Sequence, residues 1–493
     1  MGIVISSLPR NLMNYPVSET IVAPATTPGT GAISIIRLSG AECFSIADAV
    51  VRLRRGTVSG SEGYTIHYGS VFAPDGSLLD DVLVSVFRAP HSYTGEDSVE
   101  ISCHASSFIV DAIVRLLLEA GARFAEPGEF TKRAFMNGKM DLAQAEAVAD
   151  VISSTTSASH RISMQQLRGG FSKELSALRE ELLKMASLLE LELDFSEEEV
   201  EFASRGDLVN LLERTRAHVD KLADSFRLGN VIKNGVPVAI AGAVNAGKST
   251  LLNALVGDDR AIVSSVEGTT RDTIEETVNL GGILFRFIDT AGIRATSEEV
   301  ERLGIDRTFR KISEASVVLG VVDSTASPEQ ISERCEALKE LCDLDAQHLI
   351  FVLNKIDLLD EMGVNNLVTS LNIIVLSTGN KCSYVLLSAK AQNGVSELKS
   401  MLEKSQSSLL QQNADATFVT NIRHYEALVK ASKSLSSALS AIGKNLPSDL
   451  VAEDLRSAIS SVNLILGTDL LSGQSISPET ILHDIFRNHC VGK

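Results

Sequence analysis

A short glycine-rich stretch near the middle of the chain has the residue types and spacing that bind phosphate. Residues 242–249 read GAVNAGKS and fit the pattern G-x-x-x-x-G-K-[ST]. Such glycines let backbone N–H groups face phosphate oxygens, and the helix that follows adds the positive end of its dipole. Lys248 would contact the β- and γ-phosphates, and Ser249 would offer its hydroxyl to Mg²⁺. The pattern alone also fits a tight turn with an incidental lysine. The residues predicted to bind nucleotide here are Asn245, Ala246, Gly247, Lys248, Ser249 and Thr250.

Two motifs further along the chain select the base. Residues 354–357 read NKID and residues 388–390 read SAK, each after an apolar run. Asp357 can accept two hydrogen bonds from guanine N1–H and the exocyclic amine, an arrangement that adenine does not offer, and Asn354 can supply the complementary amide. The SAK segment would close the base pocket. The predicted base-binding residues are Asn354, Lys355, Ile356, Asp357, Ser388, Ala389 and Lys390.

Two segments between these motifs are predicted to respond to the γ-phosphate. Asp289 would hold the Mg²⁺ shell through water, the Gly292 N–H would sense the γ-phosphate, and Thr270 would give Mg²⁺ a second hydroxyl. Ile293 follows this turn where Ras-type enzymes carry a water-orienting glutamine, so another group must position the water. Asn245 is a plausible ligand for a monovalent cation. The order and spacing predict a GTPase domain. The full set is Ser264, Ser265, Val266, Glu267, Gly268, Thr269, Thr270, Asp289, Thr290, Ala291 and Gly292.

The elements that must position these motifs alternate between apolar strands and helices, which predicts a doubly wound α/β domain. Its strands are predicted at 236–241, 283–288, 316–322, 349–353 and 384–387. The preceding part predicts an α+β domain with strands at 32–38, 81–87 and 99–103 and a helix at 106–120. Helical periodicity over 142–228, 424–442 and 449–466 predicts an all-α helical domain built from two chain segments.

The predicted organisation is therefore a multidomain α/β and α+β protein with a GTPase domain inserted into the helical domain. The segments are 1–137 for the N-terminal α+β domain, 138–232 for the first helical half, 233–407 for the GTPase domain and 408–493 for the second helical half.

Composition limits the partners of the chain. A formal net charge of −18 over 493 residues is unfavourable for general nucleic-acid binding, so an RNA substrate would need basic surface from a partner. The apolar runs are far shorter than the roughly 20 residues of a membrane span, and no secretion signal precedes residue 18, which predicts a cytoplasmic protein. Six scattered cysteines without a C-x-x-C pair argue against a structural zinc site. The acidic run at 197–201 fits a solvated face or a helix N-terminus better than a metal site.

Four signatures outside the nucleotide motifs resemble the family of tRNA-modification GTPases MnmE, also called TrmE. The resemblance extends along nearly the whole chain. The signatures are TIVAPAT at 20–26, SYTGED at 92–97, PGEFTKRAF at 127–135 with DLAQAEA at 141–147, and CVGK at 490–493.

The resemblance implies a homodimer through the N-terminal domain, a heterotetramer with the flavin-dependent partner MnmG, and tRNA as substrate. K⁺ would replace an arginine finger, held by Asn245, Ser264, Val266 and Thr269. Glu301 would orient the water, although a solvated helix charge also fits its sequence. A folate donor, 5-formyltetrahydrofolate, would contact four residues: Arg37, Glu100, Lys139 and Lys493. The alternative is that these four residues form surface or interdomain ion pairs. Cys490 is a candidate for the alkylation chemistry.

The implied function is K⁺-dependent GTP hydrolysis, with GDP as product, coupled to carboxymethylaminomethyl or aminomethyl addition at C5 of wobble uridine. A ribosome-assembly or regulatory GTPase without group transfer, or a scaffold with a vestigial folate site, remains an alternative. Three features depart from the family: a leader before Thr20, Val244 in place of proline, and an added loop predicted at 371–383.

Overall fold

The computed structural model describes residues 19–194, 205–257, 276–288, 312–376, 382–406, 417–468 and 492. The chain divides into two compact units, which we describe separately. The first comprises Met1–Ile152, Met164–Asp220 and Glu426–Lys493, and the second comprises Ser153–Ser163 and Lys221–Tyr425. Within the described ranges, no helix is both long and apolar enough to cross a membrane.

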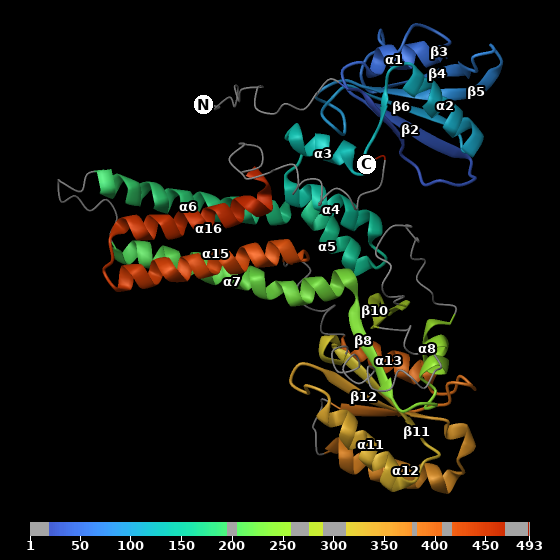
Figure 1. The fold of residues 1–493 in the computed structure, drawn as a ribbon, viewed down its shortest axis with the longest axis vertical. Coiled ribbons are helices and arrows are strands. Elements are labelled where there is room, and N and C mark those ends of the chain that lie inside the picture. Colours follow the sequence, from blue (N-terminus) through green and yellow to red (C-terminus); the bar gives the residue numbers. More distant parts are fainter. Residues whose placement is uncertain are drawn as a thin grey trace, which may run out of the picture. The chain divides into compact units, whose positions relative to one another are not determined.

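The N-terminal part of the first unit is a seven-stranded sheet with the strand order β3-β4-β5-β6-β2-β1-β7 (Figure 1). Its strands are β1 Ile21–Pro24, β2 Ile33–Ser39, β3 Val51–Leu53, β4 Thr65–Phe72, β5 Leu78–Phe87, β6 Ser98–His104 and β7 Arg123–Phe124. Helices α1 (Cys43–Val50) and α2 (Ser107–Glu119) pack on one face, where alternate residues such as Ile36 and Leu38 of β2 are buried. The predicted strands at 32–38, 81–87 and 99–103 are confirmed, as is the helix at 106–120.

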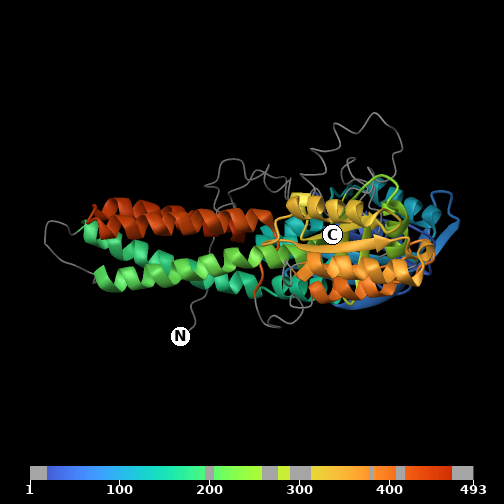
Figure 2. The same cartoon turned by 90° about the horizontal axis from the view of Figure 1, so that it is seen from below.

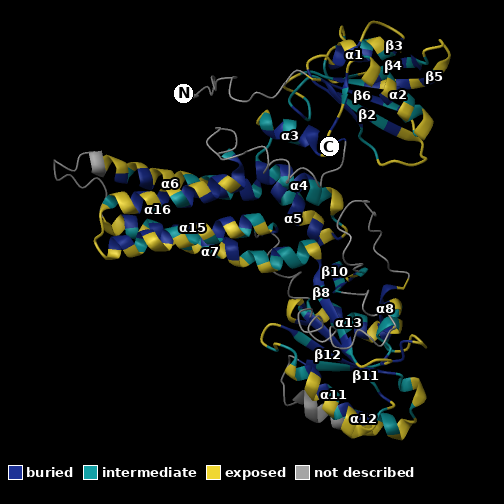
Figure 3. Ribbon diagram, in the orientation of Figure 1, coloured by how far each residue is buried: buried dark blue, intermediate teal, exposed yellow. Residues whose placement is uncertain are grey.

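Long helices form the rest of the first unit and continue into the second. They are α3 Glu129–Met136, α4 Leu142–Ser153, α5 Ser157–Leu167, α6 Gly170–Asp194, α7 Arg205–Asn234, α15 Ile422–Gly443 and α16 Ser448–Leu466. Helix α6 packs along α16, and its residues Leu175, Leu182 and Met185, spaced by three to seven positions, are fully buried (Figures 1, 2 and 3). The Arg179 Nε donates a hydrogen bond to Asn463 Oδ1 at 2.6 Å. Helices that precede and follow the GTPase motifs in sequence therefore share one core.

The second unit contains a six-stranded sheet with the order β13-β12-β11-β8-β10-β9. Its strands are β8 Val236–Gly242, β9 Glu276–Leu280, β10 Ile283–Ile288, β11 Val317–Asp323, β12 His348–Asn354 and β13 Cys382–Leu386. All neighbouring pairs are parallel except β9 and β10. The helices of this unit are α8 Lys248–Val256, α11 Pro328–Glu340, α12 Glu361–Leu376 and α13 Val395–Ser405, and η3 is a short 3₁₀ turn at Ile356–Leu358.

Burial on both faces explains the continuous apolar runs of this sheet. In β11, Val317, Leu319 and Val321 lie in one hydrophobic cluster, whereas Val318 and Val322 lie in the other. A parallel strand covered by helices on both sides has no solvent face, so its sequence does not alternate. The doubly wound arrangement agrees with the predicted strands, and β9 is an additional strand that the sequence did not reveal.

The predicted loop at 371–383 is wrong for most of its length. Helix α12 continues to Leu376, and β13 already begins at Cys382. The run LNIIVL at 371–376 is apolar except for Asn372, and it continues a helix whose Leu367 is buried in the second unit's core. Residues 377–381 lie outside the described ranges.

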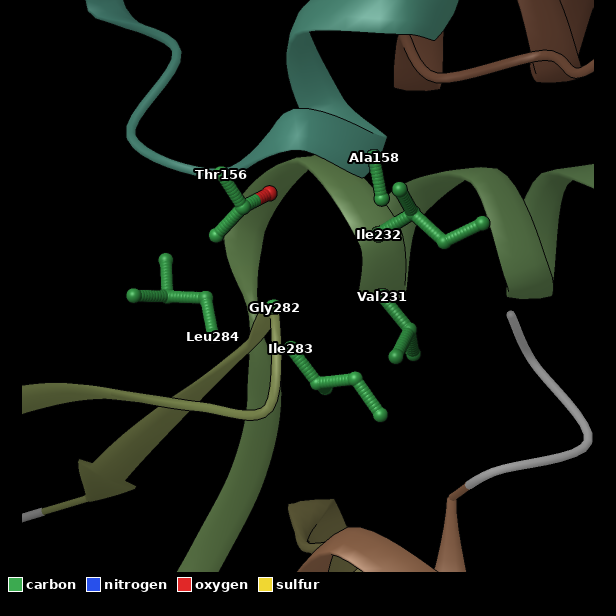
Figure 4. A pocket seen from close by; sticks show the side chains of 7 residues that line it. All are labelled: Thr156, Ala158, Val231, Ile232, Gly282, Ile283 and Leu284. Atoms are coloured by element: carbon green, nitrogen blue, oxygen red, sulfur yellow. The ribbon is translucent and has the colours of Figure 1, made fainter.

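A small apolar seam joins the segment at 153–163 to the sheet of the second unit (Figure 4). Thr156 and Ala158 face Val231 and Ile232 of α7 and the turn between β9 and β10. This turn is held by a hydrogen bond from the Gly282 N–H to Asn279 Oδ1 at 3.1 Å. A helical segment remote in sequence thus becomes part of the nucleotide-motif unit.

Candidate functional site

The phosphate loop connects the end of β8 to the start of α8. Gly247 begins the helix with a φ of 96°, in the left-handed region that favours glycine. A Cβ at this position would overlap the side-chain amide nitrogen of Asn354, so the loop lies directly against the first residue of the NKID motif. The sequence motif therefore carries a steric requirement as well as a conformational one. Asn245 also has a positive φ of 64° and is exposed.

The Lys248 side chain curls back over this loop. Its Nζ donates hydrogen bonds to the carbonyl oxygens of Gly242 at 2.8 Å and Ala243 at 2.9 Å. Burial lowers the pKa of Lys248, because the ammonium group loses water. Among the described residues no carboxylate pairs with Lys248, so its charge is available to phosphate oxygens. Ser249 and Thr250 follow in the first turn of α8.

Asn354 connects the phosphate loop to both base motifs. The residue is only 3% exposed. Its Nδ2 donates to the Ala246 carbonyl oxygen at 2.9 Å, while its Oδ1 accepts from the N–H groups of Lys355 at 2.9 Å and Ala389 at 3.0 Å. Three segments that are far apart in sequence therefore meet at one amide. The predicted contact with the base stays a prediction, and Nδ2 has a second hydrogen with which to make it.

The NKID and SAK segments lie side by side at the carboxyl ends of β12 and β13. The Ile356 N–H donates to the Leu387 carbonyl at 3.4 Å, and Ser388 is almost completely buried. Asp357 is exposed and has no hydrogen-bond or ion-pair partner in the described part of the chain. An unpartnered carboxylate three positions after Asn354 can accept two hydrogen bonds from a base edge. Lys390 is also exposed at this edge.

An ion pair that sequence reasoning missed fixes the NKID turn. Lys355 has a φ of 69°, and its Nζ lies 2.6 Å from Asp323 Oδ2 at the end of β11. Burial raises the pKa of Asp323, but hydrogen bonds from Lys355 and Thr325 outweigh it and hold that pKa below its ordinary value. The available signal was an acidic residue at the carboxyl end of a predicted parallel strand, where ligand-binding residues of such sheets gather.

Arg37 and Glu100, the N-terminal residues predicted to bind folate, form an ion pair. They are direct cross-strand partners on β2 and β6, and the Arg37 Nη2 lies 2.8 Å from Glu100 Oε1. The Arg37 guanidinium also lies 5.2 Å from the centre of the Tyr93 ring and donates from Nη1 to the Gly492 carbonyl at 3.3 Å. Lys139 is exposed and donates to the Pro90 carbonyl at 3.0 Å. The ion-pair alternative thus describes the contacts of Arg37 and Glu100, while folate binding stays a prediction.

The remaining predicted site residues lie outside the described ranges. They are Ser264, Ser265, Val266, Glu267, Gly268, Thr269, Thr270, Asp289, Thr290, Ala291, Gly292, Glu301, Cys490 and Lys493. The acidic run at 197–201 also lies outside these ranges.

A glycine loop between a parallel strand and a helix, with base-selecting motifs after two further parallel strands, defines a guanine-nucleotide-binding P-loop protein. Two family models match: the MnmE helical domain over residues 142–490 and the GTP-binding protein TrmE N-terminus over residues 20–139. The chain belongs to the MnmE family of tRNA modification GTPases, and it is a GTP hydrolase in tRNA modification.

Relatives of similar length support this assignment. The tRNA modification GTPase MnmE of Flavobacterium johnsoniae is 48% identical over 480 residues, which cover 96% of this chain and 99% of the relative. The protein of the same name from Bacteroides fragilis is 46% identical over 96% of this chain and 99% of the relative. That from Christiangramia forsetii is 47% identical over 97% of this chain and 100% of the relative.

Proposed function

We propose that this chain is a K⁺-dependent GTPase that acts with an MnmG-type flavoprotein to modify C5 of wobble uridine in tRNA. The added group is carboxymethylaminomethyl or aminomethyl, and a folate donates the one-carbon unit. The reaction takes place in the cytoplasm. The observation that carries the proposal is the meeting of the phosphate loop, NKID and SAK at Asn354, in a chain similar to MnmE proteins over 96% of its length.

The phosphate loop fits the proposed nucleotide and cation chemistry. Lys248 offers a desolvated ammonium group, and Ser249 a hydroxyl suited to Mg²⁺. The exposed Asn245 side chain has no hydrogen-bond partner among the described residues, so its amide oxygen is available to K⁺. A cation at that position would stabilise negative charge that grows on the phosphates in the transition state. Ser264, Val266 and Thr269 would complete its ligand shell, and Glu301 would orient the attacking water.

The cation proposal is tested by GTP hydrolysis in K⁺ against Na⁺ buffer. We expect faster hydrolysis in K⁺, and loss of this stimulation in Asn245→Ala. Asn253→Ala is a matched control, because Asn253 is an exposed asparagine on α8 just beyond the loop. Equal wild-type rates in the two buffers would overturn the cation mechanism.

The folate proposal is supported by the charge arrangement on β2 and β6. Arg37 is held by Glu100 beside an aromatic ring, and the exposed Lys139 offers a second cation. Carboxylates of a folate tail need such cations, and the amine face of a pterin needs a carboxylate such as Glu100. Lys493 would add a third positive charge. Calorimetric titration with 5-formyltetrahydrofolate tests this site, and an absence of binding heat at several temperatures would contradict it.

The proposed homodimer is supported by apolar side chains on the open face of the N-terminal sheet. Ile66 is 68% exposed and Leu83 is 46% exposed, while Tyr68 stands directly opposite Leu83. Exposed apolar patches of this kind mark interfaces in other proteins. Ile66→Asp should shift the mass measured by light scattering from dimer to monomer, and an unchanged dimer would exclude this face.

We propose the domain boundaries predicted from the sequence, although the two compact units divide the helical segments at other residues. The packing of α6 against α16 supports a helical domain assembled from residues 138–232 and 408–493, with the GTPase domain at 233–407 inserted between them. Residues 1–137 would form the folate-binding domain. The tRNA affinity would come largely from the partner, because this chain carries a net charge of −18.

A further inference from the structure

Helix α7 carries a notch that receives the backbone of the segment at 417–421. Gly229 is buried, and a Cβ built on it would overlap the Val419 carbonyl oxygen and lie 3.0 Å from the carbonyl carbon. About one turn earlier, Ser225 Oγ accepts a hydrogen bond from the Val419 N–H at 3.0 Å and donates one to the Leu222 carbonyl at 2.6 Å. Both backbone polar groups of Val419 therefore lie against one face of α7, and Val419 is fully buried.

The close approach of Val419, and not the helix, requires glycine at position 229. Gly229 lies inside α7 and has no positive φ. In a helix interior alanine is more favourable than glycine, because glycine loses more backbone entropy. A stacked pair of rings, Phe226 and Tyr425, lies at the same junction, with centres 4.7 Å apart and planes 18° apart. The notch and the ring pair join segments that are 194 positions apart in the sequence.

The last turns of α7 are also fixed to the nucleotide-binding sheet. A single residue, Gly235, connects α7 to β8, and its φ of 88° lies in the left-handed region. A Cβ at Gly235 would lie 3.1 Å from both the Cγ and the carbonyl oxygen of Leu284. Figure 4 shows Val231 and Ile232 of α7 beside Ile283 and Leu284 of β10. Because β8 ends in the phosphate loop, the end of α7 and this loop belong to one continuous, tightly packed piece of chain.

We propose that Ser225 and Gly229, which we call the Val419 notch, form a joint that couples GTP hydrolysis to group transfer on tRNA. The chain enters the sheet of the second unit through α7, and the segment at 417–421 leads from this unit into α15. The notch fixes these two crossings to each other, so a movement of the sheet is carried into α7 and α15 together. Gly229 is then a positioning residue, which acts through the two helices. The coupling role rests on the proposed function, whereas the contact itself does not.

The test compares variants of the full-length chain. Gly229→Ala adds a methyl group where the Val419 carbonyl obstructs it, and Ser225→Ala removes the acceptor of the Val419 N–H without adding volume. Gly443→Ala is the matched control. Gly443 also lies in a helix without a positive φ, but no other segment of the described chain lies within 4 Å of a Cβ built there.

Hydrogen–deuterium exchange is measured by mass spectrometry on peptides covering residues 417–425, and GTP hydrolysis and tRNA modification with the flavoprotein partner are measured in parallel. We expect the wild type and Gly443→Ala to protect these peptides. Gly229→Ala should exchange at least tenfold faster, with Ser225→Ala between them. We expect tRNA modification by Gly229→Ala to fall at least tenfold while GTP hydrolysis stays within twofold. If Gly229→Ala does not fold, Ser225→Ala decides the same questions with the same readouts.

Equal protection in all four proteins would overturn the notch. Retained tRNA modification despite lost protection would overturn its coupling role. A parallel loss of GTP hydrolysis and tRNA modification would also overturn that role, because the notch would then only support the nucleotide-binding fold. If the wild type hydrolyses GTP but does not modify tRNA, the proposed function fails and the coupling role fails with it, while the exchange measurement still decides whether the notch exists.

Discussion

Replacement of Asn354 tests the idea that one buried amide assembles the nucleotide site. In Asn354→Ala, the Ala246 carbonyl and the N–H groups of Lys355 and Ala389 all lose their side-chain partner. A buried polar group left unsatisfied costs about 1–3 kcal/mol. Ala246 and Ala389 are buried, whereas Lys355 is partly solvated, so we expect local opening to become about 3 kcal/mol easier in total. At about 1.4 kcal/mol per factor of ten, this corresponds to roughly a hundredfold change.

The assay is native-state hydrogen exchange of the Lys355 and Ala389 amides, together with titration by a fluorescent GDP analogue. Asn354→Ala should accelerate exchange of both amides and weaken GDP binding by about tenfold to a hundredfold. Asn354→Asp keeps the acceptor for both amides but removes the donor to Ala246, so it should weaken binding with less effect on exchange. Asn234→Ala is the control, because its side-chain amide is exposed and, among the described residues, bonds only the Asn230 side chain. Exchange within twofold of the wild type in Asn354→Ala would refute the reasoning.

Three further predictions concern single charges. Lys248→Met removes the desolvated ammonium group from the phosphate loop, so nucleotide affinity should fall about a hundredfold in a fluorescence titration; unchanged affinity would exclude the predicted phosphate contact. Asp357→Asn removes a charged acceptor of two hydrogen bonds and should weaken GTP binding at least about a hundredfold. Unchanged GTP binding in this variant, or equal competition by ATP in the wild type, would exclude the guanine assignment. Burial raises the pKa of Glu129, but hydrogen bonds from Arg123 and the Glu126 N–H and the charge of Arg133 outweigh it, so that pKa lies below its ordinary value of 4.5. The stabilising contribution of the Glu129 carboxylate is therefore present above pH 4.5 and is lost as the pH falls through the lower folded-state pKa. At pH 7 the wild type should unfold at a higher temperature than Glu129→Gln, by an amount that corresponds to about 1–3 kcal/mol. This difference in unfolding temperature should shrink below about pH 4.

The sequence by itself determined the chemistry and most of the elements. The spacing of Gly242, Gly247 and Lys248 predicts a phosphate loop, because phosphate binding there depends on the local backbone conformation of the glycines and of the first helical turn. Asp357 predicts guanine specificity, because the ability of a carboxylate to accept two hydrogen bonds from the guanine edge is a property of the side chain alone. The parallel strands of the second unit were predictable as continuous apolar runs, since both faces of the sheet are covered.

Local pattern failed where a segment's environment decides its conformation. The run at 371–376 contains no glycine or proline and continues α12, yet its apolar residues gave no helical periodicity to read. The antiparallel strand β9 was missed because only its pairing with β10 makes it a strand. Neither feature depends on the residues of the segment alone.

Only the tertiary structure decided which distant residues meet. Asn354 reaches Ala246 across 108 positions, and Arg37 reaches Gly492 across 455. A motif specifies which hydrogen bonds a side chain can form, but the sheet order and register decide which residue is its partner. For this reason Gly492, which the sequence shows only as part of the terminal CVGK signature, is the residue whose carbonyl oxygen accepts a hydrogen bond from Arg37.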